Sequence, residues 1–385
     1  MKKKDKHIQS KSPSQGGDGE AHSPSFGGVG EALKILVIQQ KMIGDVLTSS
    51  LICENLKLNF PGAEIHYLIN RFTLPVVENH PCVDKIIIFE SEYQKSKIRF
   101  YKFLKQIARQ NYTHVFDAYA KLESLLISRF SKADHRYGFK KLYSKFYYTR
   151  TVKINNTSDT EAGTAIENRL RLLKLMPDVI IHKNKPKIYL TNSEIEGAKS
   201  KLNNYDLKGE HCIMISALGS NKTKTYPLEF MAELLDYISA ISQSRLILNF
   251  MPSQQSEIDE LINYCDSKTQ HTIITDIEMK GLRDFMSICQ QCSAIVGNEG
   301  GAINIAKALD VPSFSIFSPW IIKEGWNSFE INHPNDSVHL SDYQNDLYIK
   351  NEAKYIKKNV EKFYNKLKPE LIKEKLSSFL KAYVN

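Results

Sequence analysis

Long hydrophobic runs are absent from this sequence. No stretch approaches the ~18 apolar residues that a membrane-spanning helix needs. The first residues, MKKKDK, carry lysines, but no apolar core follows them, so we expect no secretory signal. Residues 1–31 are instead rich in Ser, Gly, Pro and Lys and cannot bury enough apolar surface to fold. We therefore predict a disordered N-terminal tail over residues 1–31.

Cysteine is scarce and scattered, with six residues in a chain of 385. This pattern predicts reduced thiols and a cytoplasmic location. Cys289 and Cys292 form a C-x-x-C pair, which leaves two interpretations: a zinc or redox site, or an ordinary helix over 282–291 with Cys292 near its end. Because no second pair follows, we favour the helix.

Acidic residues are fewer than basic ones, 43 against 52, and the net charge is +9. Such a surface attracts nucleic acid, phosphorylated sugars or an acidic membrane face, although it can also serve solubility alone. Segment 129–150 interleaves basic and aromatic residues. It could bind RNA or a phosphorylated glycolipid, or it could be a solvated edge.

Two series of alternating strands and helices occupy most of the chain. The first begins with LKILVI at 33–38, an apolar run typical of a strand buried on both faces. The second begins near Lys187 and includes a similar run, CIMIS, at 212–216. The alternation predicts α/β lobes with Rossmann-like, doubly wound parallel sheets. We expect an N-terminal lobe over 32–185 and a C-terminal lobe over 186–345, facing across a ligand-binding cleft.

Two regions depart from this alternation. Most of residues 118–185 is predicted to be less regular, up to a helix over 164–175. Residues 346–385 are lysine-rich and helical in pattern, and Pro369 divides them into two helices. We expect the apolar side of these basic C-terminal helices to pack on the first lobe. The alternative is that their basic side rests on an anionic membrane.

A carboxylate follows the first strand. Gly44 permits a close backbone approach, and Asp45 opens the predicted helix over 45–58. An acidic residue in this position can simply cap the helix. If it projects into the cleft, however, it can accept a proton from an acceptor hydroxyl that attacks a sugar.

The segment SALGSNKTKTYP at 216–227 follows a strand and opens a helix, which makes it a candidate anion site. It would stabilise a diphosphate leaving group through lysine charges and hydroxyl donors. A solvated basic loop is the alternative. The side chains concerned are those of Ser220, Lys222, Thr223, Lys224 and Thr225.

The segment GNEGG at 297–301 also lies between a strand and a helix. Gly300 and Gly301 let the backbone approach a ligand closely, with their N–H groups at the helix start, where phosphates bind. Glu299 would repel phosphate but can accept hydrogen bonds from sugar hydroxyls. A tight turn with a helix cap is the alternative.

With these motifs the chain resembles glycosyltransferase family 9, the ADP-heptose:lipopolysaccharide heptosyltransferases. Three segments carry the resemblance, in matching order and spacing, between about Leu33 and Pro319: KILVIQQKMIGDVLTSSLICENLKLNFPGAEIHYL, the 224–227 loop, and IVGNEGGAINIAKALDVPSFSIFSP. The resemblance implies the GT-B fold, with the donor in the second lobe and the acceptor in the first. It also implies inverting transfer without metal or cofactor, and the chain likewise contains no Asp-x-Asp.

The resemblance also assigns roles to single residues. It implies that Asp45 is the catalytic base and that Met279 lies beside the nucleoside. The donor sugar is expected at Glu299 and Asn304, where the family usually has Asp and His; Gly300 replaces the usual Ser or Thr. The donor diphosphate is expected at Ser220, Lys224, Thr225, Gly300 and Gly301.

The implied activity is transfer of a heptose-like sugar from an ADP-sugar to a lipid-linked or lipopolysaccharide core acceptor. We expect a cytoplasmic enzyme that does not bind nucleic acid, with the inner face of the membrane as a further partner. Three alternatives stay open. They are a GT-B transferase for another nucleotide sugar, a basic protein that binds nucleic acid or membrane without turnover, and a catalytically silent relative.

Overall fold

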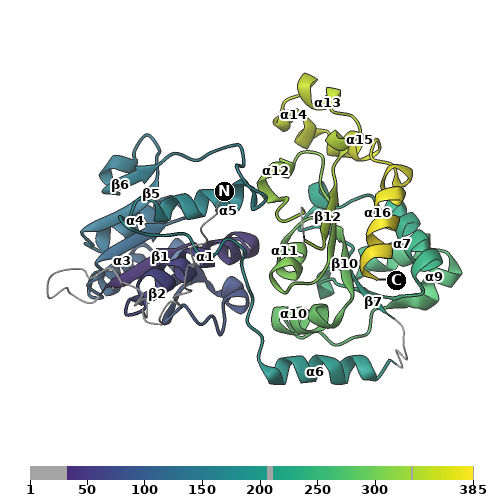
Figure 1. Ribbon diagram of the computed structural model, residues 1–385, viewed down its shortest axis with the longest axis horizontal. Coiled ribbons are helices and arrows are strands. Elements are labelled where there is room, and N and C mark those ends of the chain that lie inside the picture. Colours follow the sequence, from purple (N-terminus) through teal and green to yellow (C-terminus); the bar gives the residue numbers. More distant parts are fainter. Residues whose placement is uncertain (1–32, 206–210, 331–332, 385) are drawn as a thin grey trace, which may run out of the picture. The chain divides into compact units, whose positions relative to one another are not determined.

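The computed structural model describes residues 33–205, 211–330 and 333–384. Figure 1 shows how helices accompany the strands of each sheet. The tail predicted over residues 1–31 lies outside the described residues. In the part of the chain that the structure describes, no helix combines the length and the apolar character needed to cross a bilayer.

The first sheet has six parallel strands in the order β3-β2-β1-β4-β5-β6. Its strands are β1 (Lys34–Ile38), β2 (Glu64–Asn70), β3 (Lys85–Phe89), β4 (His114–Asp117), β5 (His135–Phe139) and β6 (Arg150–Val152). Its helices are α1 (Ile43–Asn59), η1 (Arg71–Val76), α2 (Ser91–Lys95), α3 (Lys97–Ala108), α4 (Leu122–Phe130), η2 (Ser144–Phe146) and α5 (Gly163–Leu173).

The second sheet also has six parallel strands, in the order β12-β11-β10-β7-β8-β9. Its strands are β7 (Cys212–Ser216), β8 (Arg245–Leu248), β9 (Ile273–Ile274), β10 (Ala294–Asn298), β11 (Ser313–Ile316) and β12 (Asn335–Val338). The helices among them are α6 (Asn192–Asn203), η3 (Lys222–Lys224), α7 (Leu228–Ser242), η4 (Pro252–Gln254), α8 (Gln255–Tyr264), α9 (Ser267–Thr272), α10 (Leu282–Gln291), α11 (Gly301–Ala308) and α12 (Lys323–Trp326).

Both sheets therefore have the same topology. Numbered within its own series, each runs 3-2-1-4-5-6, the doubly wound order in which ligands bind where the chain reverses direction across the sheet. That switch point lies between β1 and β4 in the first sheet and between β7 and β10 in the second. The α/β prediction is confirmed, and the predicted motifs follow β1, β7 and β10.

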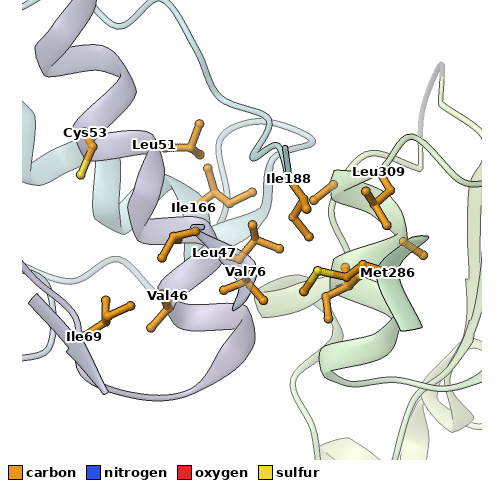
Figure 2. Close-up of a cluster of buried hydrophobic side chains, with 14 of the residues drawn as sticks. Val46, Leu47, Leu51, Cys53, Ile69, Val76, Ile166, Ile188, Met286 and Leu309 are labelled. Carbon is orange, nitrogen blue, oxygen red and sulfur yellow. The ribbon is translucent and has the colours of Figure 1, made fainter. Parts of the chain in front are cut away.

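The strands at each switch point are almost entirely buried because helices cover both faces of a parallel sheet. Ile35 and Val37 of β1 and Ile213 and Ile215 of β7 have no exposed surface. Figure 2 shows part of one core cluster, in which Leu47 of α1 belongs with Met286 of α10 and Leu309. Leu47 of α1 therefore shares a hydrophobic core with residues of the second series as well as with its own strand β1.

The prediction that residues 118–185 are less regular is wrong over its first half. α4, β5 and β6 complete the first sheet there. β5 has the sequence HRYGF and β6 is only RTV, so neither offers the apolar run that identifies β1. The pairing of β5 with β4 and of β6 with β5 supplies the order that the local sequence does not indicate.

The C-terminal helices pack on the second sheet's core and not on the first lobe, which corrects that expectation. α16 (Pro369–Tyr383) lies against α7, and Leu376 and Leu380 are fully buried there. The predicted break at Pro369 is confirmed, since α16 begins there, but the prediction of two helices is wrong, because α14 (Ala353–Lys358) and α15 (Val360–Tyr364) precede it as separate helices. Tyr226 Oη donates a 2.5 Å hydrogen bond to the carbonyl of Leu367, which ties this extension to the 216–227 loop. α13 (Asp346–Lys350) precedes it.

The C-x-x-C pair forms no disulfide. Cys289 lies inside α10 and Cys292 directly after it, both buried, so the helix interpretation is confirmed. Burial raises the pKa of the Cys289 thiol to about 12. Within residues 33–205, 211–330 and 333–384, no group of three His, Cys, Asp or Glu side chains is arranged to hold a metal ion.

Candidate functional site at the two switch points

Asp45 occupies the first turn of α1, directly after the switch-point strand β1. Its Oδ2 accepts a long hydrogen bond of 3.3 Å from the N–H of Met42, so the capping interpretation has a geometric basis. The side chain is nevertheless 26% exposed. The carboxylate therefore caps the helix only weakly and stays partly exposed.

Arg169 of α5 pairs with the other oxygen of that carboxylate, and the sequence analysis did not identify it. Its Nη2 donates to Asp45 Oδ1. Its remaining nitrogens are fixed as well: Nε donates to Ser49 Oγ at 3.1 Å and Nη1 to the carbonyl of Ala165 at 2.6 Å. A guanidinium held at three points orients the carboxylate and compensates its charge.

A second carboxylate, Asp117, ends β4 on the other side of the first switch point. It is fully buried, accepts from Tyr148 Oη at 2.7 Å and from the N–H of Ala120 at 2.8 Å, and so holds the loop after β4. Burial raises its pKa. Asp117 therefore has a structural role here, and Asp45 is the accessible acid of this pair.

The 216–227 loop is held by its own polar groups. Thr225 Oγ1 accepts from the N–H of Gly219 at 3.1 Å and donates to the carbonyl of Asn221 at 3.0 Å. The Thr225 hydroxyl therefore stabilises the loop itself. Its expected contact with a diphosphate stays a prediction. Ser220 Oγ is exposed and accepts a 3.4 Å bond from the Asn221 side chain.

Lys224 ends the short helix η3 in this loop. Its Nζ lies 5.8 Å from the centre of the Trp320 ring. The neighbouring carbonyl of Thr223 accepts from Trp320 Nε1 at 3.0 Å and from Ser318 Oγ at 2.6 Å. The loop after β11 thus fixes the backbone next to Lys224 through the Thr223 carbonyl.

Asn298, the last residue of β10, joins the two candidate anion-binding segments, a role that the sequence analysis did not assign to it. Its Nδ2 donates to the carbonyls of Ser216 at 3.1 Å and Ala217 at 2.7 Å. Its Oδ1 accepts from the N–H of Tyr226 at 2.7 Å. One buried amide therefore sets both ends of the 216–227 loop against the end of β10.

Glu299 follows Asn298 and is only 6% exposed. Among the described residues, nothing donates a hydrogen bond to its Oε2. Burial raises the pKa of the Glu299 carboxyl, while the charges of Lys224 and Lys307 oppose that rise. A buried acceptor between two cations can bind a hydroxyl of a ligand or hold a proton.

Gly300 and Gly301 begin α11, with the free N–H groups of the helix start beside Glu299. Asn304 Nδ2 donates to the carbonyl of Gly300 at 2.9 Å and so stabilises this turn. A methyl group added at Gly301 would lie 3.6 Å from Ile43, and one added at Gly44 would lie 3.4 Å from Asn304 Nδ2. The turn that carries Asp45 therefore adjoins the start of α11.

The structure brings the predicted residues together to different degrees. Lys224 and Glu299 lie within each other's electrostatic influence, and Asn304 bonds the Gly300–Gly301 turn. Asp45 is linked to that turn through its neighbours Ile43 and Gly44. Met279 lies in the loop after β9, partly buried against the core, at the same edge of the second sheet.

Two doubly wound parallel sheets with polar loops at both switch points are the architecture of the GT-B fold. Structural comparison supports this fold. A glycosyl transferase family 9 protein from Veillonella parvula DSM 2008 has a TM-score of 0.74 at 15% identity, covering 90% of this chain and 97% of that one. The E. coli heptosyltransferase WaaC with ADP has a TM-score of 0.62 at 16% identity, covering 86% and 100%.

Sequence comparison identifies the family. The profile of glycosyltransferase family 9 (heptosyltransferase) matches residues 100–323, more than half of the chain. Lipopolysaccharide heptosyltransferase 1 of Campylobacter coli is 22% identical over 298 residues, which cover 74% of this chain and 84% of that protein. This chain belongs to glycosyltransferase family 9 and is a glycosyltransferase, as its resemblance predicts.

Proposed function

We propose that this protein transfers a heptose-like sugar from an ADP-sugar to a lipid-linked or lipopolysaccharide core acceptor, with inversion at the anomeric carbon. The observation that carries the proposal is the pairing of an accessible carboxylate, Asp45, with an anion-binding turn at the start of α11. The contact of Ile43 with the Gly301 position supports that pairing. The named relatives, which are heptosyltransferases, support the sugar class.

In the proposed reaction the acceptor hydroxyl donates a hydrogen bond to Asp45 Oδ2. Its oxygen attacks the anomeric carbon as the bond from that carbon to the diphosphate oxygen breaks. Asp45 takes the hydroxyl proton, and the electron pair of the broken bond leaves with ADP. Attack from the face opposite the diphosphate inverts the anomeric centre.

The leaving diphosphate gains negative charge in the transition state. Lys224, the Ser220 hydroxyl and the N–H groups of Gly300 and Gly301 are the donors that we assign to it. Donors fixed before the reaction stabilise developing charge without a cost of reorganisation. The bonds of Asn298 and Thr223 hold these donors in place.

Glu299 and Asn304 are assigned to the donor sugar and Met279 to the nucleoside. The buried Glu299 Oε2 without a hydrogen-bond donor among the described residues is the acceptor that a sugar hydroxyl would satisfy. The reaction as written passes through protein side chains and requires no metal ligand set.

The base assignment is tested with Asp45→Asn, which keeps the shape and the contact from Arg169 but cannot take the proton. We expect kcat to fall by roughly 10²–10⁴, the usual effect of losing a general base. Asp134→Asn, which changes an exposed acid just before β5, is the matched control. Calorimetric titration with ADP should give the same Kd for all three proteins. Asp45→Asn with full activity would remove Asp45 from the mechanism.

The donor assignment is tested separately, by thermal shift with ADP-heptose and a set of other ADP-, UDP- and GDP-sugars. We expect ADP-heptose to raise the melting temperature most, since ligands that bind the native state stabilise it according to their affinity. A larger shift with another nucleotide sugar would reject the heptose donor and leave sugar transfer standing. No shift with any of them would favour a protein without turnover.

A further inference from the structure

A pocket of about 250 Å³ lies at the carboxyl ends of β11 and β12, outside the candidate site described above. The loop after β11 supplies one wall with Trp320, and the loop after β12 supplies another with His339. α13 and α14 add the remaining wall through Tyr348 and Ile356. Open α/β sheets bind ligands at the carboxyl ends of their strands, so this pocket is in a position suited to a ligand.

His339 brings a buried hydrogen-bond donor to this pocket. The residue is 3% exposed, and burial lowers the pKa of its ring, which is therefore neutral at pH 7. Its Nδ1 accepts from the N–H of Ser341 at 3.2 Å, so the proton of the neutral ring belongs to Nε2. Among the described residues Nε2 has no hydrogen-bond partner, although the carbonyl of Pro319 is near enough to affect the pKa of the ring. A ligand oxygen can therefore accept a hydrogen bond from Nε2.

The hydroxyl of Tyr348 is a second polar group without a partner at this pocket. Its oxygen is buried and has no hydrogen-bond partner in the part of the chain that the structure describes. The centres of the Tyr348 and His339 rings are 5.1 Å apart, so the two groups are neighbours in the lining. Burial raises the pKa of Tyr348, which keeps the hydroxyl protonated and able to donate as well as accept. A ligand hydroxyl can thus accept a hydrogen bond from one of these groups and donate to the other.

The charges at the pocket compensate one another, which argues against an anionic ligand. Lys323 Nζ donates to Asp342 Oδ2 at 2.9 Å, and Glu324 adds a carboxylate to the lining. Lys357 Nζ lies 4.1 Å from the centre of the Trp320 ring and covers that face of it. Neutral hydroxyl, amide and apolar side chains complete the lining, among them Ser341, Asn345, Asn351, Ile321, Ile322 and Ile356. Polar groups beside apolar surface match a sugar ring, which carries hydroxyls at its edge and C–H groups on its faces.

Two contacts connect this pocket to the candidate site. Trp320 Nε1 donates to the carbonyl of Thr223 at 3.0 Å, within the 216–227 loop. A methyl group added at Gly163, where α5 begins, would lie 3.4 Å from the carbonyl oxygen of Glu324. The pocket therefore adjoins both the 216–227 loop and the helix that carries Arg169.

We propose that this pocket binds one neutral sugar unit, with Nε2 of His339 and the hydroxyl of Tyr348 as its principal hydrogen-bonding groups. The isoleucines of the lining contact the C–H face of the ring. The site goes beyond the proposed function, because neither the transferred sugar nor the reacting hydroxyl occupies it. In the proposed transfer the bound unit belongs to the acceptor, away from the hydroxyl that reacts, and this assignment alone rests on the proposed function.

The test uses the fluorescence of Trp320 in the full-length Trp326→Phe protein, which keeps Trp320 as its single tryptophan. D-Galactose and D-glucose are titrated into it, with ADP and inorganic phosphate in parallel. We expect a saturable change with at least one of the two sugars. Its Kd should be on the order of 1–10 mM, as suits a ligand of about twelve non-hydrogen atoms.

Three variants and a control are made in the same protein. Tyr348→Phe and His339→Asn should each raise the Kd about 3–10-fold, the effect of one lost hydrogen bond, and His339→Asn keeps an acceptor for the N–H of Ser341. Ala353→Phe fills part of the pocket and should abolish the fluorescence change. Tyr383→Phe, which alters a 42% exposed tyrosine of α16, is the matched control and should leave the Kd unchanged.

Melting curves establish that each variant is folded, and calorimetry with the unaltered tryptophans replaces fluorescence if Trp326→Phe is not. The proposal is overturned if neither sugar binds at ten times the expected Kd, or if Tyr348→Phe and Ala353→Phe bind sugar as tightly as the control. Tighter binding of ADP or phosphate that both of these variants lose would overturn it in favour of an anion site. None of these titrations requires transfer, so their failure leaves the proposed function untouched, and an enzyme inactive with ADP-heptose would still bind the sugar here.

Discussion

The two sheets share one strand order, yet their switch points differ in chemistry. In the first, a partly exposed carboxylate is fixed by a guanidinium from α5. In the second, a lysine, two glycines and a buried glutamate gather around a backbone turn that an asparagine holds. The shared topology determines where ligands can reach the sheet edge, whereas the side chains determine which half of a transfer reaction each edge can serve.

The difference extends to the backbone itself. Gly297 in β10 has φ +138°, and a side chain there would overlap the carbonyl oxygen of Ser216 in β7. At Gly297, therefore, β7 and β10 approach each other more closely than any side chain would permit. In the first sheet the corresponding strand end carries Asp117, whose carboxylate bonds the next loop.

Gly297→Ala should therefore have the largest effect on folding. We expect the free energy of unfolding to fall by roughly 3 kcal/mol or more, from backbone strain and overlap together. Gly62→Ala is the control, because no atom lies within 4 Å of the added methyl, and it should change stability by less than about 0.5 kcal/mol. Urea unfolding measures both. If the two variants are equally stable, β7 and β10 can move apart to accommodate the methyl group without loss of stability.

Arg169→Met should lower the rate of transfer without altering the binding of ADP. Losing the cation leaves the Asp45 carboxylate without its fixed partner, so we expect kcat to fall about 10–100-fold while the Kd for ADP is unchanged. Arg169→Lys should recover part of the rate, and Arg171→Met on the same helix serves as control. A lower melting temperature with normal kcat would assign Arg169 a purely structural role.

Lys224→Ala should instead weaken the binding of ADP. We expect the Kd for ADP to rise by about tenfold, since a hydrogen bond between two charged groups is lost. Lys222→Ala, an exposed lysine two residues earlier, should change it little. Calorimetric titrations at one fixed salt concentration make the comparison. If both variants bind ADP equally, the loop acts through its summed charge and not through Lys224.

The smallest expected effect concerns Lys307, whose pKa burial lowers to about 8. Between pH 8 and its unfolded pKa of about 10.4, the unfolded chain binds a proton that the folded chain does not, so stability rises with pH across that window. Relative to Lys307→Met, the gain should be on the order of 1 kcal/mol. Chemical unfolding at pH 7.5, 9 and 10 measures it. Parallel curves for the two proteins would show that Lys307 is charged throughout.

Much of the fold could be predicted because most central strands are continuous apolar runs. β1, β7 and β8 are apolar along most of their length, and each follows or precedes a periodic helix. β12, with the sequence NDSV, could not be predicted in this way. Its burial comes from pairing with β11 and from side-chain bonds such as Ser313 Oγ to Asn335 Oδ1 at 2.8 Å, which no local pattern encodes.

The candidate site likewise has a part that the sequence predicts and a part that it does not. The loops after β1, β7 and β10 could be identified because glycines, lysines and acids follow apolar runs at short spacing. Arg169 is 124 residues from Asp45, so no local motif joins them. One signal was available: Arg169 lies three residues after buried Ile166, on the apolar side of α5. A cation in such a position predicts a carboxylate partner, but not which one.

The bond between Tyr226 and Leu367 has a consequence for how the enzyme is synthesised. Asp45 and its partner Arg169 have both been synthesised once the ribosome has passed Arg169, whereas the bond between Tyr226 of the 216–227 loop and Leu367 can form only when Leu367 has emerged. A nascent chain thus acquires the Asp45–Arg169 pair nearly two hundred codons before it can make the Tyr226–Leu367 bond that ties the 216–227 loop to the C-terminal helices.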